Sequence, residues 1–115
     1  MHALRHRHAC LALMAVIALC LGLAGHPHAQ TKPKMHIVVI EAMQFSPQKL
    51  EVNVGDTIVW KNKDPFPHTV TAEDRSFDSG NIAENRTWKL KARKMGTVPY
   101  SCKLHSTMKA SLVVK

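Results

Sequence analysis

Hydrophobic and polar positions follow two different patterns along the chain, and the change falls near residue 30. Residues 1–8 carry two arginines among three histidines, an unbroken apolar run follows from Ala9 to Gly25, and a short polar segment reaches Ala29. A positive start, an apolar run and a small final residue form a secretory signal peptide, so we expect cleavage after Ala29 and export to the periplasm. The apolar run has 17 residues, slightly fewer than a membrane span, and an uncleaved anchor stays open as the alternative.

Beyond residue 30, apolar and polar residues alternate with a period of two, which is typical of half-buried β-strands. Clusters of Gly, Asn, Asp and Pro separate these runs, as they do in turns. The regular spacing of seven or eight short strands predicts an all-β fold, an antiparallel sandwich or barrel formed by a single domain at 30–115. The expected strands cover residues 35–41, 50–54, 58–60, 69–72, 87–92, 97–102 and 110–114.

The alternation also predicts which side chains point into the core. Val98, Tyr100 and Cys102 share one face of their strand, and Trp60 and Trp88 are expected to anchor the core. The proline between Val98 and Tyr100 cannot donate a hydrogen bond to a neighbouring strand, so we expect it at a bulge or an edge.

Charge and motif content exclude several classes of function. The chain has 16 Lys and Arg against 8 Asp and Glu, and since the predicted signal removes two arginines and no acid, residues 30–115 keep a net charge of +6. Basic and aromatic residues do not interleave as on a nucleic-acid surface, so we interpret the basic excess as solvated surface. The histidine pair of zinc proteases, a phosphate-binding glycine loop and a redox Cys-x2-Cys are all missing. We therefore expect a protein that is not an enzyme.

Cleavage at Ala29 would leave Cys102 as the only cysteine and His36, His68 and His105 as the only histidines. A disulfide within the monomer is then impossible, and a single thiol in an exported protein calls for an explanation. Burial, a nucleophilic role or metal ligation would each provide one. No pattern around His36 indicates a partner, so we expect an ordinary surface histidine there.

The residues that follow Cys102 favour metal ligation. Cysteine, histidine and methionine recur every three residues at Cys102, His105 and Met108, and His68 stands 34 residues before Cys102. One thiolate, two imidazoles and a thioether form the ligand set of a blue-copper site, in which methionine is a weak axial ligand. The soft thiolate suits Cu(I) and also bonds to Cu(II), while imidazoles accept both states. We predict that these four residues bind one copper ion.

Several motifs resemble those of the cupredoxins and together cover nearly all of residues 35–115. They are Phe45-Ser46-Pro47, Leu50-Glu51-Val52, residues 55–62, Pro67-His68-Thr69-Val70 and Tyr100-Ser101-Cys102. The short Cys102-x2-His105-x2-Met108 loop looks most like that of the amicyanins. The resemblance implies a Greek-key β-sandwich with one type 1 copper, which carries single electrons between redox proteins by Cu(I)/Cu(II) cycling.

The resemblance also implies roles for individual residues. His68 would be the buried imidazole, His105 would lie at the surface as the electron port, and Thr69 would tie the two ligand loops together. Ser106 and Thr107 replace the proline and the bulky apolar residue that amicyanin-like loops carry, which makes the rim of the site more polar.

Lys103 and Lys109 flank the loop and predict a positive border around the port. We therefore expect a monomer that docks a redox donor and acceptor through their acidic surfaces, binds no nucleic acid and has no membrane contact after signal cleavage. Two other functions stay open: a periplasmic copper carrier or chaperone that delivers metal rather than electrons, and a basic β-sandwich module without metal. Met108 and the strand pattern argue against a Cys–His nucleophile.

Overall fold

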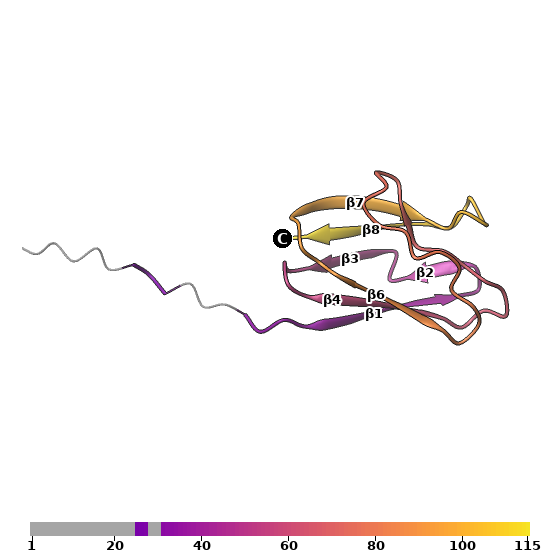
Figure 1. Cartoon of the computed structure of the whole chain (residues 1–115), viewed down its shortest axis with the longest axis horizontal. Helices are drawn as coiled ribbons and strands as arrows, with labels where there is room; N and C mark the ends of the chain where they lie inside the picture. The colour runs from indigo at the N-terminus through magenta and orange to yellow at the C-terminus, as the bar shows by residue number, and fades with distance from the viewer. Residues whose placement is uncertain (1–24, 28–30) are drawn as a thin grey trace, which may run out of the picture.

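The computed structural model describes residues 25–27 and 31–115, so the predicted signal peptide at 1–29 lies almost wholly outside the described residues. These ranges contain eight β-strands in two layers (Figure 1), and no helix in them is long and apolar enough to cross a membrane. The strands are β1 (Met35–Glu41), β2 (Gln44–Ser46), β3 (Lys49–Val52), β4 (Thr57–Asn62), β5 (Thr71–Ala72), β6 (Thr87–Lys91), β7 (Gly96–Ser101) and β8 (Lys109–Val114).

The strands form two four-stranded sheets that pack as a sandwich. Sheet A has the strand order β2-β1-β4-β6, and sheet B has the order β3-β8-β7-β5. The chain changes sheet several times, so that β1 lies beside β4 and β3 lies beside β8. The architecture confirms the predicted all-β sandwich of seven or eight strands.

Three details differ from the sequence-based prediction. The pairs β1–β4 and β3–β8 are parallel, whereas an antiparallel sandwich was expected, because alternation shows which face is buried but not the direction of the neighbouring strand. The strand expected at 69–72 is reduced to Thr71–Ala72, since His68 and its neighbours turn toward Ile82 instead. β2 was not predicted, because three residues with one buried side chain are too few to show a period.

The proline in β7 lies in an inner strand of sheet B rather than at its edge, but just beyond the end of β5. β5 ends at Ala72, which pairs with Tyr100, so the ladder on that side of β7 stops one residue short of Pro99. The carbonyl oxygen of Pro99 accepts a 2.9 Å hydrogen bond from the N–H of Glu73 on this side. The missing N–H of the proline therefore leaves no strand partner unsatisfied.

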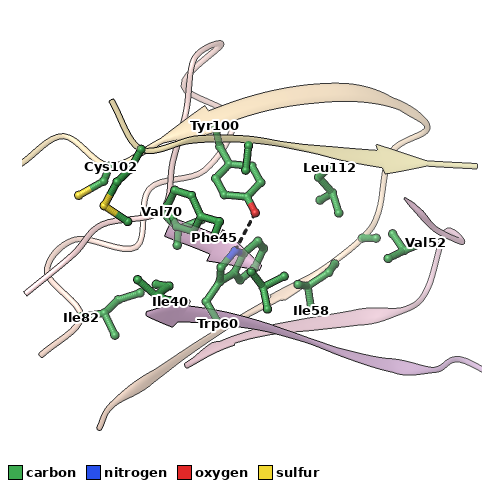
Figure 2. Close-up of a cluster of buried hydrophobic side chains, with 14 of the residues drawn as sticks. Ile40, Phe45, Val52, Ile58, Trp60, Val70, Ile82, Tyr100, Cys102 and Leu112 are labelled. Carbon is green, nitrogen blue, oxygen red and sulfur yellow. Dashed lines mark hydrogen bonds between the residues drawn. The ribbon is translucent and has the colours of Figure 1, made fainter. Parts of the chain in front are cut away.

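The inward side chains of both sheets form one core. Trp60 and Tyr100 are almost completely buried in it, as the alternation predicted, and Trp60 Nε1–H donates a 3.2 Å hydrogen bond to the Tyr100 hydroxyl oxygen (Figure 2). Burial raises the pKa of Tyr100 to about 12, although this hydrogen bond acts to lower it. Cys102 and Ile82 lie at one end of the cluster and Val52 at the other (Figure 2), so the thiol is built onto the end of the core.

We expect Tyr100→Phe to lower the free energy of unfolding by about 1–3 kcal/mol, because the buried Trp60 Nε1–H loses its acceptor. Urea denaturation of the wild type, Tyr100→Phe, Trp60→Phe and the double variant would measure the effect. The double variant should lose less free energy of unfolding than the two single variants together, because it no longer contains the Trp60 Nε1–H that Tyr100→Phe leaves without an acceptor. Strictly additive costs would show that the hydrogen bond contributes nothing.

His36 has a buried partner, so the expectation of an ordinary surface histidine is wrong. Its side chain is 24% exposed, and Nε2 lies 2.8 Å from a carboxylate oxygen of Asp56. Asp56 is itself buried and also accepts hydrogen bonds from the main-chain N–H groups of Lys34 and Asn53. These bonds, with the one to Lys34 foremost, lower the pKa of Asp56 to about 2. The carboxylate fastens the start of β1 to the turn before β4.

This carboxylate gives stability a defined pH dependence. Because the pKa of Asp56 is lower in the folded chain than its ordinary value of 3.8, its contribution is complete above about pH 4 and is lost as the pH falls toward 2. We expect the free energy of unfolding of Asp56→Asn to fall less than that of the wild type as the pH drops from about 4 to about 2. Urea denaturation at stepped pH would test this, with the exposed Glu84→Gln as the matched control, and parallel curves for wild type and Asp56→Asn would contradict it.

Candidate metal centre

His68 is held inside the sandwich by main-chain pairing. After β4 ends, its N–H donates to the carbonyl of Ile82 at 3.2 Å, and the Ile82 N–H donates back at 2.7 Å. The Asn62 side-chain amide also donates to the carbonyls of Phe66 and Ile82, which fixes the loop on both sides of His68. The imidazole is completely buried, as expected for the inner of the two histidines.

Cys102 directly follows β7 and begins a tight loop. Its N–H donates to the carbonyl of Met108 at 3.1 Å, and the Met108 N–H donates to the carbonyl of His105 at 3.0 Å. Both bonds close the loop on itself, with Cys102 and Met108 buried and His105 half-buried. In Figure 1 this loop joins β7 to β8 at the end of the sandwich away from the C-terminus.

Three of the four predicted ligand residues meet at one point. Cys102 Sγ lies 3.8 Å from His68 Nδ1 and 3.7 Å from His105 Nδ1, and the ligand atoms of all three lie within 4.8 Å of one another. Zinc–ligand bonds provide a scale, at about 2.0 Å to imidazole nitrogen and about 2.3 Å to sulfur. With a trigonal angle of about 120° at the metal, these bond lengths place the nitrogen and the sulfur about 3.7 Å apart. The donor set and its spacing therefore fit one ion held by two nitrogens and one sulfur.

Asp64 determines which nitrogen of His68 faces the sulfur. Its carboxylate lies 2.8 Å from His68 Nε2 and accepts the N–H groups of Ala42 at 2.7 Å and Met43 at 3.0 Å. Burial acts to raise the pKa of Asp64, but these hydrogen bonds outweigh it and hold the pKa below its usual value. Because an ionised carboxylate can only accept, Nε2 carries the proton and Nδ1 keeps its lone pair for a metal.

Thr69 connects the two ligand loops, which confirms its predicted role. Its N–H donates to Cys102 Sγ at 3.3 Å, and its hydroxyl oxygen accepts the N–H of Lys103 at 2.9 Å. The same hydroxyl contacts Thr71, which in turn donates to Asp78. One amide hydrogen bond therefore reaches the sulfur that a metal would share.

The positive border predicted beside His105 is weaker than expected. The Lys103 ammonium forms an ion pair with the Asp78 carboxylate, whose pKa is lowered chiefly by this lysine. Lys109 forms no ion pair among the described residues. Phe66 and Leu104, each about half exposed, add apolar surface at this end of the molecule.

Sequence reasoning did not single out Asp64. Its signal is its place four residues before His68, but an aspartate beside a proline is normally interpreted as a turn residue. Its role depends on Ala42 and Met43, which lie more than twenty residues away in the sequence. Met108 is buried within the loop, and its thioether remains a predicted fourth ligand.

The site, with two imidazoles and one buried cysteine sulfur at the end of a β-sandwich, has the donor set of type 1 copper centres. The family model of the cupredoxin-like domain matches residues 12–114, and the chain belongs to this family.

Curated relatives include an amicyanin from Paracoccus denitrificans, 27% identical over 84 residues, and a plastocyanin from Vicia faba, 32% identical over 76 residues. The first alignment covers 69% of this chain and 64% of the amicyanin; the second covers 55% and 77%. This chain therefore spans less than two thirds of the length of that amicyanin. Neither relative carries the name of an enzyme, in agreement with the expectation that this chain is not an enzyme.

Solved structures show the same fold. A single-residue mutant of amicyanin in its Cu(I) form superposes with a TM-score of 0.67 at 27% identity, covering 76% of this chain and 88% of that one. A copper-containing nitrite reductase from Thermus scotoductus superposes with a TM-score of 0.68, covering 74% of this chain and 23% of that one. At 23% identity the second match shows a shared fold and nothing more.

Proposed function

We propose that this chain is an exported type 1 copper protein that carries single electrons between redox partners. The triangle of His68 Nδ1, Cys102 Sγ and His105 Nδ1 is the observation that carries the proposal, because it provides two imidazoles and one thiolate at bonding distance from a common point. Bound copper would supply a one-electron couple, and Met108 would supply the weak axial ligand.

The chain's own contribution is rigidity. Asp64 fixes the His68 imidazole, the Thr69 N–H bonds the sulfur, and the loop from Cys102 to Met108 is closed by two main-chain hydrogen bonds. A site fixed in this way changes little when charge is gained or lost, which keeps the cost of reorganisation low. The half-buried His105 provides the route for the electron to the surface, while His68 is sealed inside.

A copper titration tests the function. Added Cu(II) should give one-to-one binding with intense visible absorption that ascorbate bleaches and an oxidant restores. A colourless, redox-silent copper complex would instead indicate a carrier that delivers metal. Failure to bind copper would leave a metal-free module.

We expect Met108→Gln to keep copper binding and to lower the reduction potential. An amide oxygen is a harder ligand than a thioether and stabilises Cu(II) relative to Cu(I). A spectroelectrochemical titration would measure the shift, with Met95→Gln, an exposed methionine 70% accessible to solvent, as the control. An unchanged potential would remove Met108 from the ligand set.

The remaining parts of the proposal concern location and partners. The positive start and apolar run of residues 1–25 support export to the periplasm, which sequencing of the N-terminus of the exported protein would test. The net positive charge and Lys109 support redox partners with acidic docking surfaces, although Asp78 offsets Lys103. Association with such a partner should slow as salt rises, and a rate independent of ionic strength would contradict this proposal.

A further inference from the structure

The outer face of sheet A carries an apolar strip that none of the eight described strands covers. Met35 and Ile37 in β1 are 63% and 60% exposed, and Val39 is half-buried beside them. Val59 of β4 pairs with Ile37 and continues the strip onto the neighbouring strand, although its own side chain is only 7% exposed. These four residues, the apolar strip, lie on the flank of the sandwich, whereas the metal centre lies at its end.

Three lysines border the apolar strip on the side of β6. Lys89 lies opposite Val59 and Lys91 lies opposite Thr57, while Lys61 of β4 lies opposite Val39. All three are exposed, and none belongs to an ion pair among the described residues. Along the strands of this face the only acidic residue is Glu41, at the last position of β1. We call Lys61, Lys89 and Lys91 the lysine border.

The outer face of sheet B has a different character. Its β7 positions are Thr97, Pro99 and Ser101, and Ser111 of β8 pairs with Pro99. Its glutamate, Glu51, forms an ion pair with Lys115. Lys49 of β3 and Lys109 of β8 are also exposed and outside every ion pair among the described residues, so unpaired lysines occur on both outer faces. The two strongly exposed large apolar side chains of the described strands, Met35 and Ile37, both lie on sheet A, and only there do lysines border such side chains.

We propose that the outer face of sheet A binds an anionic lipid surface reversibly. Apolar side chains between cations are the pattern of proteins that lie in a membrane interface, and each lysine near an anionic surface adds attraction. The border consists of lysines, whose compact, strongly hydrated charges suit diffuse attraction to headgroups, whereas protein interfaces deplete lysine and favour arginine. This contact replaces the expectation that the cleaved chain has no membrane contact.

The placement has a consequence for the metal centre. A molecule lying on sheet A keeps the ends of the sandwich at the side, so His105 and the loop from Cys102 to Met108 stay open to a partner. The protein would then diffuse along the membrane plane rather than in three dimensions. This inference does not depend on copper, since the face is formed by β1, β4 and β6 alone.

Vesicle binding tests the proposal on the exported protein. We expect binding to phosphatidylcholine vesicles that contain phosphatidylglycerol, weak binding to pure phosphatidylcholine, and release by salt. The triple variant Lys61→Gln, Lys89→Gln, Lys91→Gln should bind the anionic vesicles about a hundredfold more weakly. Lys49→Gln, Lys109→Gln, Lys115→Gln, with the same charge change on sheet B, should retain wild-type binding within about threefold. All variants share the same N-terminal segment, so differences in their vesicle binding come from the substituted faces and not from that segment.

Ile37→Ser separates the two parts of the face. It should weaken binding to anionic vesicles severalfold while leaving the salt dependence unchanged, because it removes apolar contact but no charge. Equal losses in both triple variants would show a response to net charge and overturn the proposal, as would absent binding of the wild type. Binding to soluble polyglutamate but not to vesicles, with the same dependence on the lysine border, would assign the face to an acidic protein instead.

Discussion

Cys102→Ser should abolish the visible absorption of the copper-loaded protein completely. The absorption arises from a sulfur–copper bond, and a serine hydroxyl supplies neither the sulfur nor, at neutral pH, an ionised ligand. The Cys102 sulfur lies within 3.8 Å of both imidazoles, at the centre of the site. Because Cys102 is the only cysteine among the described residues, no neighbouring thiol can replace it. Absorption spectra after Cu(II) addition would check this.

The apoprotein should tolerate the same change. Serine is slightly smaller than cysteine, and its oxygen can accept the Thr69 N–H that now donates to Sγ. We expect the metal-free variant to melt close to the wild type but to lose the rise in melting temperature that copper gives, a rise equivalent to about 4 kcal/mol when free copper exceeds Kd a thousandfold. Thr107→Ala, in the same loop, should keep both colour and rise. A blue Cys102→Ser protein would contradict the proposed copper site.

How far sequence predicts this site depends on how locally each residue is placed. The spacing alone predicts that Cys102, His105 and Met108 lie close together, because a loop of seven residues between two strands cannot separate their side chains far. His68 comes from another part of the chain, and only its motif linked it to the loop. Its 3.8 Å approach to the sulfur depends on how sheets A and B pack, which periodicity does not specify.

The same reasoning accounts for what sequence missed. Alternation correctly predicted the inward face of β7 and the burial of Trp60 in β4, because burial on one face forces a period of two. It could not give the parallel pairing of β1 with β4, nor the partner of His36, because Asp56 lies twenty residues away in a turn with no period. Buried carboxylates that serve main-chain N–H groups look like turn residues in a sequence, and both such residues here, Asp56 and Asp64, were missed for this reason.

Asp64→Asn should weaken copper binding by about ten- to a hundredfold, the usual cost of losing a group that orients a ligating histidine. The carboxylate serves three donors: the N–H groups of Ala42 and Met43 and the Nε2–H of His68. An asparagine has one oxygen, so its NH2 group must face at least one of these donors. The His68 ring then loses the partner that holds a proton on Nε2 and orients Nδ1 toward Cys102 Sγ.

A structural role and a positioning role for Asp64 predict different results. Ala42 and Met43 have positive φ angles of 52° and 62°, and the carboxylate holds their turn, so some loss of apoprotein stability is expected in either case. Only a positioning role also lowers copper affinity, measured by chelator competition at a temperature where both apoproteins are folded. Asp74→Asn, an exposed carboxylate that accepts the N–H of Ser76, is the matched control and should change neither quantity appreciably. If Asp64→Asn reduced stability while copper affinity stayed at the wild-type value, Asp64 would support the turn at residues 42–43 without orienting His68.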